Sequence, residues 1–415
     1  EIHNEICRRG LFGEDFVVGT ALVDMYSKCG ELVRAHEVFN ELPTRNVVSW
    51  STLMSGYVQQ GHFSIALELF QRMCTESGII PNETAFSCAI KACGRIEALT
   101  KAKLIHKEIV NIGYESNMIV GSSLVDMYVR CKCLEEARQV FDNLPNRDLV
   151  SWAAMVAGYA SHGCGISALG LYKKMQDDGM KPDKVTFLCV LKACGSMGSI
   201  KHGNLVFDEI ITDGFESDVT IGNALIDMYM KCGGLESAQK VFVKLCIRTV
   251  VAWGAMISGY AQHGNFKEVQ LYLDDMSSAG IKPDGVIFTN ILSACSHAGL
   301  IDEGYAYFQL MRNGYKISPT IQHYNCFIDL FGAIGYLLEA QYLLLSIPLE
   351  HNIIGWTSLL SHCRKYAEAE IVRKCFKRAV SMDCRHASFY VLMSSMYSEF
   401  GMWEEAEQPQ AMKVV

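Results

Sequence analysis

Two tripeptides of the form His-x-Glu are the first residues in this sequence whose pattern could do chemistry. They are His3-Asn4-Glu5 and His106-Lys107-Glu108. In zinc-dependent nucleobase deaminases such a histidine binds the metal and the glutamate transfers protons, but a C-x-x-C pair must supply the remaining ligands. The 415 residues contain no C-x-x-C, and Cys131 and Cys133 lie one residue too close together. A glycine-rich phosphate loop is also lacking. We therefore predict no catalytic site, no metal site and no cofactor.

Seventeen cysteines could suggest a disulfide-bonded protein, but their positions argue against it. Cysteines recur at equivalent places about 101 residues apart, in the sets Cys29, Cys131, Cys232 and Cys93, Cys194, Cys295. Equivalent places in a repeated structure are too distant to bridge, whereas a small, weakly polar side chain suits a helix packed against its neighbour. We predict reduced cysteines in a reducing interior.

The segments that carry these residues repeat along the chain. Three tracts align almost letter for letter: TALVDMYSKCGELVRAHEVFNELPTRNVVSWSTLMSGY from Thr20, SSLVDMYVRCKCLEEARQVFDNLPNRDLVSWAAMVAGY from Ser122, and NALIDMYMKCGGLESAQKVFVKLCIRTVVAWGAMISGY from Asn223. One supersecondary unit cannot bury its own apolar face, so the copies must stack on one another. The sequence predicts an all-α protein, an α-solenoid superhelix of tandem helix-turn-helix repeats.

Each superperiod divides into three units with helical spacing. In the unit from Val250, apolar residues recur at steps of three and four, at Trp253, Met256, Ile257 and Tyr260. Such spacing places one apolar stripe on a first helix. The chain is expected to turn left-handed after that helix, at the glycines Gly61, Gly163 and Gly264. A second helix follows in each unit.

The unit lengths alternate in a regular rhythm. Units are predicted to begin at Phe16, Val47, Glu83, Met118, Leu149, Lys184, Val219, Val250, Gly285 and Ile321, followed by Ile353 and Ala387. A tryptophan stands at the fourth place of the units from Val47, Leu149 and Val250, namely Trp50, Trp152 and Trp253.

This pattern resembles pentatricopeptide repeats of the plant type in which P, L and S variants alternate. Residues 1–15 resemble the second half of an L repeat, and residues 16–352 resemble the tandem P, L and S array. Residues 353–415 resemble two degenerate repeats called E motifs, of which the second is atypical because Gln408-Pro409-Gln410 interrupts its helix. The chain opens at EIHNEICRRG without an initiator Met, so it is expected to be a fragment. No run of 18 apolar residues exists, so no membrane insertion is expected.

The resemblance implies a protein that binds single-stranded RNA, with one base read per repeat. By resemblance the fifth and the last residue of each unit read the base. The pairs are Thr20 with Asn46, Ser51 with Asn82, Ser122 with Asp148, Asn223 with Thr249, and Asn325 with Asn352. A hydroxyl with an amide suits adenine, and a hydroxyl with a carboxylate suits guanine, which presents two donors. In the family, Asn at the fifth place favours pyrimidines. The implied target is 5'-A A n G n n Y n n C-3'.

Other units are expected to read poorly or uncertainly. Ala153 with Asp183 and Gly254 with Asp284 lack the first polar partner. The L-type pairs, whose reading is uncertain, are Ser87 with Asn117, Leu188 with Asp218, and Thr289 with Thr320.

Each of these interpretations has a structural alternative. The last residue of a unit could serve only as the N-cap of the next helix. The second-place valines, Val48, Val150 and Val251, could flank the bases or be core residues. The cations Lys28, Arg130 and Lys231 could contact phosphates or complement a helix C-terminus. The net charge of −8 is unusual for an RNA-binding protein and indicates modest non-specific affinity.

The array that ends in L, S, E and E units resembles site-recognition factors for cytidine-to-uridine editing in plant mitochondria or chloroplasts. The resemblance implies that a partner brings the deaminase, either a deaminase-bearing pentatricopeptide repeat protein or another editing factor. The alternatives are a splicing, stability or processing factor for an organellar transcript, and a protein-interaction scaffold. The tetratricopeptide repeat is such a scaffold. The alternation of 31-residue with 35-residue units and the recurring KCG and KPD segments argue against it.

Overall fold

The computed structural model describes residues 3, 6, 16–75, 78–346, 353–366, 370–374 and 387–399. Within these ranges the regular elements are helices, with no strand, so the predicted all-α solenoid is confirmed. None of the described helices is both long and apolar enough to cross a membrane. The chain forms two compact units, Glu1–Ile210 and Ile211–Val415.

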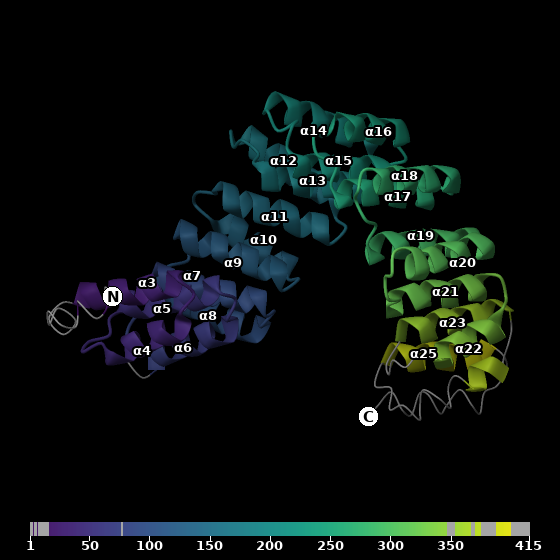
Figure 1. The fold of residues 1–415 in the computed structure, drawn as a ribbon. Coiled ribbons are helices and arrows are strands. Elements are labelled where there is room, and N and C mark those ends of the chain that lie inside the picture. The colour runs from purple at the N-terminus through teal and green to yellow at the C-terminus, as the bar shows by residue number, and fades with distance from the viewer. Residues whose placement is uncertain are drawn as a thin grey trace. The chain divides into compact units, whose positions relative to one another are not determined.

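The first unit is a stack of helical hairpins, each made of a first and a second helix (Figure 1). Its first helices are α3 (Phe16–Lys28), α5 (Val47–Gln59), α7 (Glu83–Arg95), α9 (Met118–Arg130), α11 (Leu149–Ser161) and α13 (Lys184–Ser196). Its second helices are α4 (Leu32–Glu41), α6 (Phe63–Thr75), α8 (Leu99–Ile112), α10 (Leu134–Asn143), α12 (Gly165–Asp177) and α14 (Ile200–Thr212), whose last two residues pass the boundary. Each first helix packs on the next first helix.

The second unit repeats this arrangement (Figure 1). Its first helices are α15 (Val219–Lys231), α17 (Val250–Gln262), α19 (Gly285–Ala298), α21 (Ile321–Ala333), α23 (Ile353–Tyr366) and α25 (Ala387–Glu399). Its second helices are α16 (Leu235–Lys244), α18 (Phe266–Ser278), α20 (Ile301–Gln309), which continues into the π-helix η1 (Leu310–Gly314), and α22 (Leu337–Ser346). The interrupted segment at Gln408-Pro409-Gln410 lies outside the described residues.

An aromatic contact fastens each of three hairpins to the next. The ring of Trp50 on α5 meets that of Phe39 on α4 edge to face, with the ring centroids 4.7 Å apart. The same contact recurs at 4.8 Å between Trp152 and Phe141 and between Trp253 and Phe242. Edge-to-face geometry is the arrangement that aromatic quadrupoles favour. The tryptophan of one hairpin is thus packed against the second helix of the preceding one.

The predicted glycine turns lie where expected. Gly61, Gly163 and Gly264 have φ angles of 82°, 75° and 73°. L-residues with a Cβ rarely adopt this left-handed region, whereas glycine enters it without steric cost. These positions end the first helices and let the second helices fold back.

The described cysteines are free thiols. Cys93, Cys194 and Cys295 are fully buried at one equivalent place on α7, α13 and α19. Burial raises the pKa of Cys93 to about 11 and that of Cys295 to about 12, so both thiols are protonated at neutral pH. All three side chains act as small packing residues.

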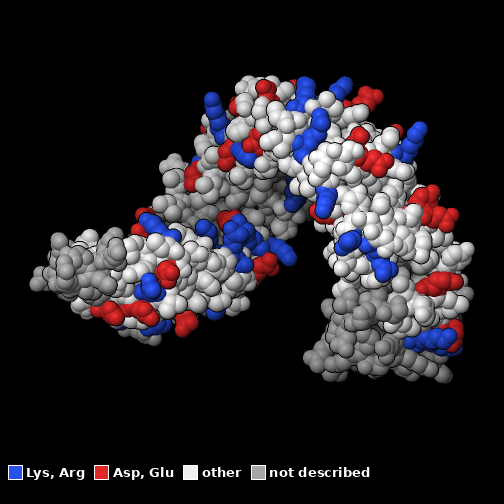
Figure 2. Space-filling view, viewed as in Figure 1, with Lys and Arg blue, Asp and Glu red and all other residues white. Residues whose placement is uncertain are grey.

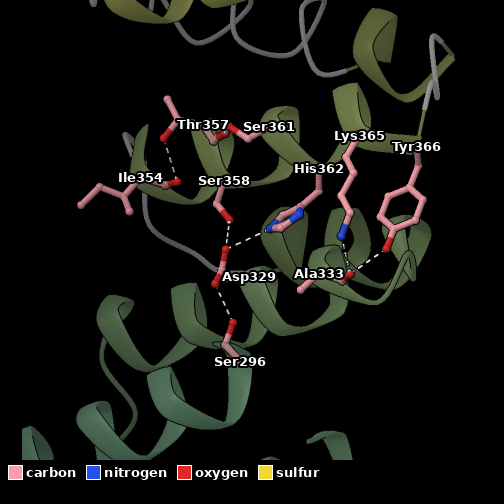
Figure 3. A network of polar contacts seen from close by, with 10 residues as sticks. All are labelled: Ser296, Asp329, Ala333, Ile354, Thr357, Ser358, Ser361, His362, Lys365 and Tyr366. Carbon is pink, nitrogen blue, oxygen red and sulfur yellow. Dashed lines mark hydrogen bonds and ion pairs between the residues drawn. The ribbon is translucent and has the colours of Figure 1, made fainter. Parts of the chain in front are cut away.

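A carboxylate joins three successive first helices in the second unit (Figure 3). Asp329 on α21 accepts hydrogen bonds from Ser296 Oγ of α19 at 2.5 Å, and from Ser358 Oγ and His362 Nε2 of α23 at 2.9 and 3.0 Å. The bond from His362, with those from the two serines, holds the pKa of Asp329 well below its usual range, although burial opposes this. A Cβ at Gly332 would collide with the His362 ring, so the glycine admits this histidine.

The same place serves a different contact in the units from Phe16, Met118 and Val219, which resemble S-type repeats. Asp24, Asp126 and Asp227 each form an ion pair with a cation four residues later on their own helix. In α21 the residue four places after Asp329 is Ala333, which has no charge, and its carbonyl accepts from Tyr366 Oη at 2.6 Å (Figure 3). Losing the local cation therefore leaves the carboxylate free to bind the neighbouring helices.

We expect Asp329→Asn to lower the free energy of unfolding by about 1 to 3 kcal/mol, because it weakens charge-assisted hydrogen bonds to two other helices. Asp227→Asn is the matched control. It removes an exposed intrahelical ion pair and should cost less than about 1 kcal/mol. Urea unfolding of the three proteins at neutral pH measures both values.

The Asp329 contribution should also depend on pH. Because the folded pKa lies below the unfolded value near 3.8, this stabilisation is present above pH 3.8 and is lost as the pH falls below it. The difference between wild type and Asp329→Asn should therefore shrink on acidification below that value. Equal destabilisation by both variants, or a difference that is constant with pH, would contradict this role.

Candidate nucleic-acid interface

In the units from Phe16 to Gly285, the last residue is the N-cap of the next first helix. The caps with a side-chain bond to the helix backbone are Asn46, Asn82, Asn117, Asp148, Asp183, Asp218, Thr249 and Asp284. The first N–H groups of a helix lack intrahelical partners, and Asn, Asp and Thr side chains satisfy them. Capping is therefore real at these positions. In each Asn or Asp the cap uses Oδ1, which leaves the other polar atom, Nδ2 or Oδ2, outside the cap.

One predicted pair meets in the first unit. Asp148 Oδ1 accepts from the backbone N–H of Ser151 at 2.8 Å and from Ser122 Oγ at 2.8 Å. Ser122 is buried, with 4% of its surface exposed, whereas Asp148 is half-buried. The cap and the serine both bind Oδ1 and so fix the orientation of the carboxylate. No hydrogen bond to Oδ2 occurs within the described part of the chain, so this oxygen can accept from a ligand.

A second predicted pair meets in the second unit. Asn223 Nδ2 donates to Thr249 Oγ1 at 3.2 Å, while Thr249 Oγ1 also accepts from the backbone N–H of Ala252 at 3.3 Å. Asn223 Oδ1 is buried and has no hydrogen-bond partner in the structure. A buried acceptor without a donor is uncommon in folded proteins and calls for an explanation.

Two other predicted pairs, Thr20 with Asn46 and Ser51 with Asn82, are not joined by a hydrogen bond among the described residues. Thr20 Oγ1 donates to the carbonyl of Phe16 at 2.8 Å, and Ser51 Oγ donates to the carbonyl of Val47 at 2.8 Å. Their partners Asn46 and Asn82 cap α5 and α7 through Oδ1 at 2.9 Å each. Asn325 is half-buried on α21, and its predicted partner Asn352 lies outside the described residues.

The second-place valines are surface residues. Val48, Val150 and Val251 are 50%, 60% and 63% exposed. Exposed apolar side chains recur at the same place of other units, at Val17, Ile119, Val185, Val286 and Ile354. This exposure removes the alternative that they are core residues. In the first unit, an exposed apolar side chain therefore lies two residues after the N-caps Asn46, Asn117, Asp148 and Asp183. At α7 this place is occupied by a threonine instead.

The cations at the ends of the S-type first helices have partners that sequence reasoning did not include. Lys28 Nζ lies 2.6 Å from Asp24 Oδ2, and Lys231 Nζ lies 2.6 Å from Asp227 Oδ2. Arg130 Nε lies 2.7 Å from Asp126 Oδ2 in the same register. Such exposed pairs are weak, so each cation can exchange its partner at little cost.

Arg130 also lines a groove in the first unit. The groove has a volume of about 530 Å³ and lies at the ends of α7, α9 and α11. Arg95 and Lys132 line it with Arg130, and so do Glu97 and Asp126. Figure 2 shows Lys and Arg side chains gathered in the part of this unit that contains α9, with acidic side chains interspersed. The local charge is thus mixed rather than strongly basic.

An arginine just before the cap was not singled out from the sequence. Arg147 precedes Asp148; its Nε donates to the carbonyl of Phe141 at 3.0 Å, and its guanidinium lies 5.0 Å from the Phe141 ring centroid. Arg45 and Arg248 make the same contacts with Phe39 and Phe242. Arginine favours such stacking on aromatic faces. Its recurrence one residue before the last place was the signal that could have revealed it.

The His-x-Glu residues make ordinary structural contacts where they are described. His106 Nδ1 lies 2.8 Å from Tyr128 Oη, and burial lowers the pKa of His106. Among the described residues there is no group of three or more His, Cys, Asp or Glu side chains that could hold a metal. Asn4 and Glu5 lie outside them.

Family models match the same repeats. A PPR repeat model matches residues 20–47, 122–149, 223–248 and 251–281. A PPR repeat family model matches residues 45–95 and 147–196, and a pentatricopeptide repeat domain model matches residues 271–333.

Curated relatives from Arabidopsis thaliana match nearly the whole chain. A putative pentatricopeptide repeat-containing protein is 35% identical over 98% of this chain and 59% of the relative. A chloroplastic member is 34% identical over 98% of this chain and 50% of the relative, and a mitochondrial member is 33% identical over 97% and 72%. The chain therefore spans only part of the length of these proteins.

The fold also matches a solved structure, that of the pentatricopeptide repeat protein PPR10 from maize. The TM-score is 0.58 at 17% sequence identity, over 96% of this chain and 64% of that chain. Together with the repeat models and the relatives, this shows that the chain belongs to the pentatricopeptide repeat family.

We expect the two replacements of Asp148 to differ in stability. Asp148→Ala removes the cap of α11 and should lower the free energy of unfolding by about 0.5 to 2 kcal/mol. Asp148→Asn keeps an oxygen that accepts from Ser151 N–H and should be nearly neutral. Urea unfolding compares the variants, and equal losses for both would show that the cap does not act through this oxygen.

Proposed function

We propose that this chain binds single-stranded RNA with one base per repeat and acts as a site-recognition factor for cytidine-to-uridine editing in plant organelles. The observation that carries the proposal is the meeting of fifth-place and last-place side chains 26 residues apart, Ser122 with Asp148 and Asn223 with Thr249. Repeats of this family read one base each through two or three side chains. Family membership supplies the ligand class, and these pairs supply the polar groups.

The cap determines which group of the last residue faces a base. In Asp148 the oxygen Oδ1 is held by Ser151 N–H and Ser122 Oγ, so Oδ2 is the atom left for RNA. A carboxylate oxygen only accepts hydrogen bonds. The pairing edge of guanine presents two neighbouring donors, N1–H and the amino group, whereas that of adenine presents one. This unit is therefore expected to select guanine.

An asparagine at the same place offers the opposite polarity. Asn82 and Asn46 use Oδ1 in the cap, so each turns a donating Nδ2 outward. The neighbouring hydroxyls of Ser51 and Thr20 donate to their own helix carbonyls and keep lone pairs free to accept. One donor and one acceptor match the N1 and amino group of adenine. The first two units are therefore expected to select adenine.

The unit from Val219 offers an acceptor. Its Asn223 Oδ1 is the buried oxygen without a partner. Cytosine presents its amino group and uracil presents N3–H, and either donor would satisfy this oxygen. Pyrimidine at the seventh base follows from that chemistry and from the family's preference. The exposed valines Val48, Val150 and Val251 would contact the faces of the bases, and Lys28, Arg130 and Lys231 would contact phosphates.

The cellular part of the proposal has separate support. The curated relatives include a chloroplastic and a mitochondrial protein. The order of L, S, E and E units at the end of the array resembles editing factors, and the sequence lacks the C-x-x-C of a zinc deaminase. The proposal takes the deaminase from a partner bound to the same transcript.

Asp148→Asn should switch the fourth base from guanine to adenine, because the amide turns a donor outward where the carboxylate turned an acceptor. We expect a change of about 1 to 3 kcal/mol in relative affinity. Affinities of both proteins for two RNAs that differ only at the fourth base, measured at one salt concentration, give this value.

The control for that experiment is Asp142→Asn, which removes the same charge at an exposed ion pair with Arg138 on α10. It should leave the guanine preference unchanged. If wild type and Asp148→Asn rank the two RNAs identically, Asp148 is a helix cap alone and the base-reading proposal fails at this repeat.

The chain by itself should leave cytidine in the bound target RNA unchanged, with or without added zinc, because the ligand set of a zinc deaminase is missing from its sequence. Sequencing of the RNA after incubation measures the conversion, and an authentic cytidine deaminase acting on its own substrate serves as the positive control. Zinc-dependent turnover by the purified chain would contradict the proposal that a partner supplies the enzyme.

A further inference from the structure

The N-caps of the first helices fall into two geometric groups. In the first group the cap residue has ψ between 167° and 177°. These caps end the S-type units from Phe16, Met118 and Val219, the P-type units from Val47, Leu149 and Val250, and the unit from Gly285. At Asn117 and Asp218, which end the L-type units, ψ is 124° and 119°. There the side-chain oxygen accepts from two successive N–H groups rather than one. The last residue of an L-type unit is thus turned differently from the other caps.

In the first of these units both ends of the side-chain amide are engaged, the oxygen by two backbone N–H groups and the nitrogen by a carboxylate. Asn117 Oδ1 accepts from Ile119 N and Val120 N at 3.0 and 3.1 Å. Its Nδ2 donates to Glu83 Oε2 at 2.8 Å. Asn82, at the same place one unit earlier, uses Oδ1 in its cap, and no hydrogen bond from its Nδ2 occurs within the described part of the chain.

Glu83 is the first residue of α7 and is half-buried. The corresponding first residues of the P-type and S-type units are apolar, at Phe16, Val47, Met118, Leu149, Val219 and Val250. An apolar side chain there offers no acceptor to the last residue of its unit. A hydrogen bond to an ionised carboxylate is also about twice as strong as a neutral one. The contact between Glu83 and Asn117 is therefore a feature of this unit. It holds the amide in one orientation, and a base must compete with Glu83 for the N–H that it accepts from.

The residue at the fifth place of this unit, Ser87, does not by itself prevent the unit from reading a base. Ser87 Oγ lies 2.9 Å from Ser123 Oγ, and Ser123 Oγ in turn donates to the carbonyl of Ile119 at 2.8 Å. Ser87 is thus the donor in this contact and keeps lone pairs that can accept. The same is true of Ser51 in the unit predicted to read adenine. The difference between the two units is the amide of Asn117.

We propose that Glu83 is a specificity-determining residue that silences its repeat by holding the amide of Asn117. The inference rests on the proposed RNA reading. The repeat from Glu83 then spaces its neighbours and accepts any third base, although Ser87 and Asn117 have the types that select adenine elsewhere in the array.

The test uses the whole chain and its variants Glu83→Ala and Glu83→Gln. Binding is measured to four RNAs that differ only at the third base, and to control pairs that differ at the second or the fourth base. Wild type should bind the four RNAs within about twofold of one another. Glu83→Ala frees the amide and should prefer adenine at the third base by about fivefold or more, the lower end of usual single-base discrimination.

Glu83→Gln keeps an oxygen that can accept from Asn117, so it should behave as wild type. Equal circular dichroism spectra and melting temperatures would show that the variants fold. Discrimination by wild type at the third base would overturn the inference, and so would a flat response of Glu83→Ala together with intact selection at the second and fourth bases. Absence of selection by wild type at the second and fourth bases would instead contradict the RNA reading itself, and the inference with it.

Discussion

Each first helix from α5 to α19 begins at a hydrogen bond from its backbone to the side chain of the preceding unit's last residue. A helix needs such a bond because its first N–H groups have no intrahelical acceptor. An amide or a carboxylate has two polar atoms, and the cap engages one of them, as Asp148 and Asn82 do. The remaining atom is then directed by the helix rather than left to rotate. In the proposed reading, one side chain would serve both stability and recognition, and changing Asp to Asn alters the second atom while keeping the first.

The hydrophobic core holds these caps in place. In the hairpin before Asp148, Phe141 packs edge to face with Trp152 and lies under the guanidinium of Arg147. Arg147 also satisfies the carbonyl of Phe141 at the end of α10. The residue that follows the arginine is the cap, so the aromatic contact between hairpins positions the polar group that would meet the RNA. The same set of contacts recurs around Phe39 and Phe242.

The repeat pattern was enough to predict the paired helices and the left-handed turns at residues such as Gly61, because apolar periodicity and glycine act within one unit. The helices also begin at the residues chosen as unit boundaries, from Val47 to Ile321. Contacts between units were harder to predict from the sequence. The bond from Asn117 to Glu83 and the network around Asp329 depend on which neighbouring side chain is within reach. The sequence did carry signs of both, a charge at a usually apolar first place and an alanine where a cation was expected. Neither sign defines a contact until the helices are stacked.

The central claim is that the polar atoms left free on the fifth-place and last-place side chains select the base in the units where both residues are polar and unblocked. Selection of bound molecules from an RNA pool randomised across the whole target, followed by sequencing, tests this most directly, since it assumes no target in advance. The account predicts enrichment of adenine at the first two bases, guanine at the fourth and a pyrimidine at the seventh, with no selection at the third. Bound RNAs without enrichment at these positions, or with preferences unrelated to the capping residues, would contradict it.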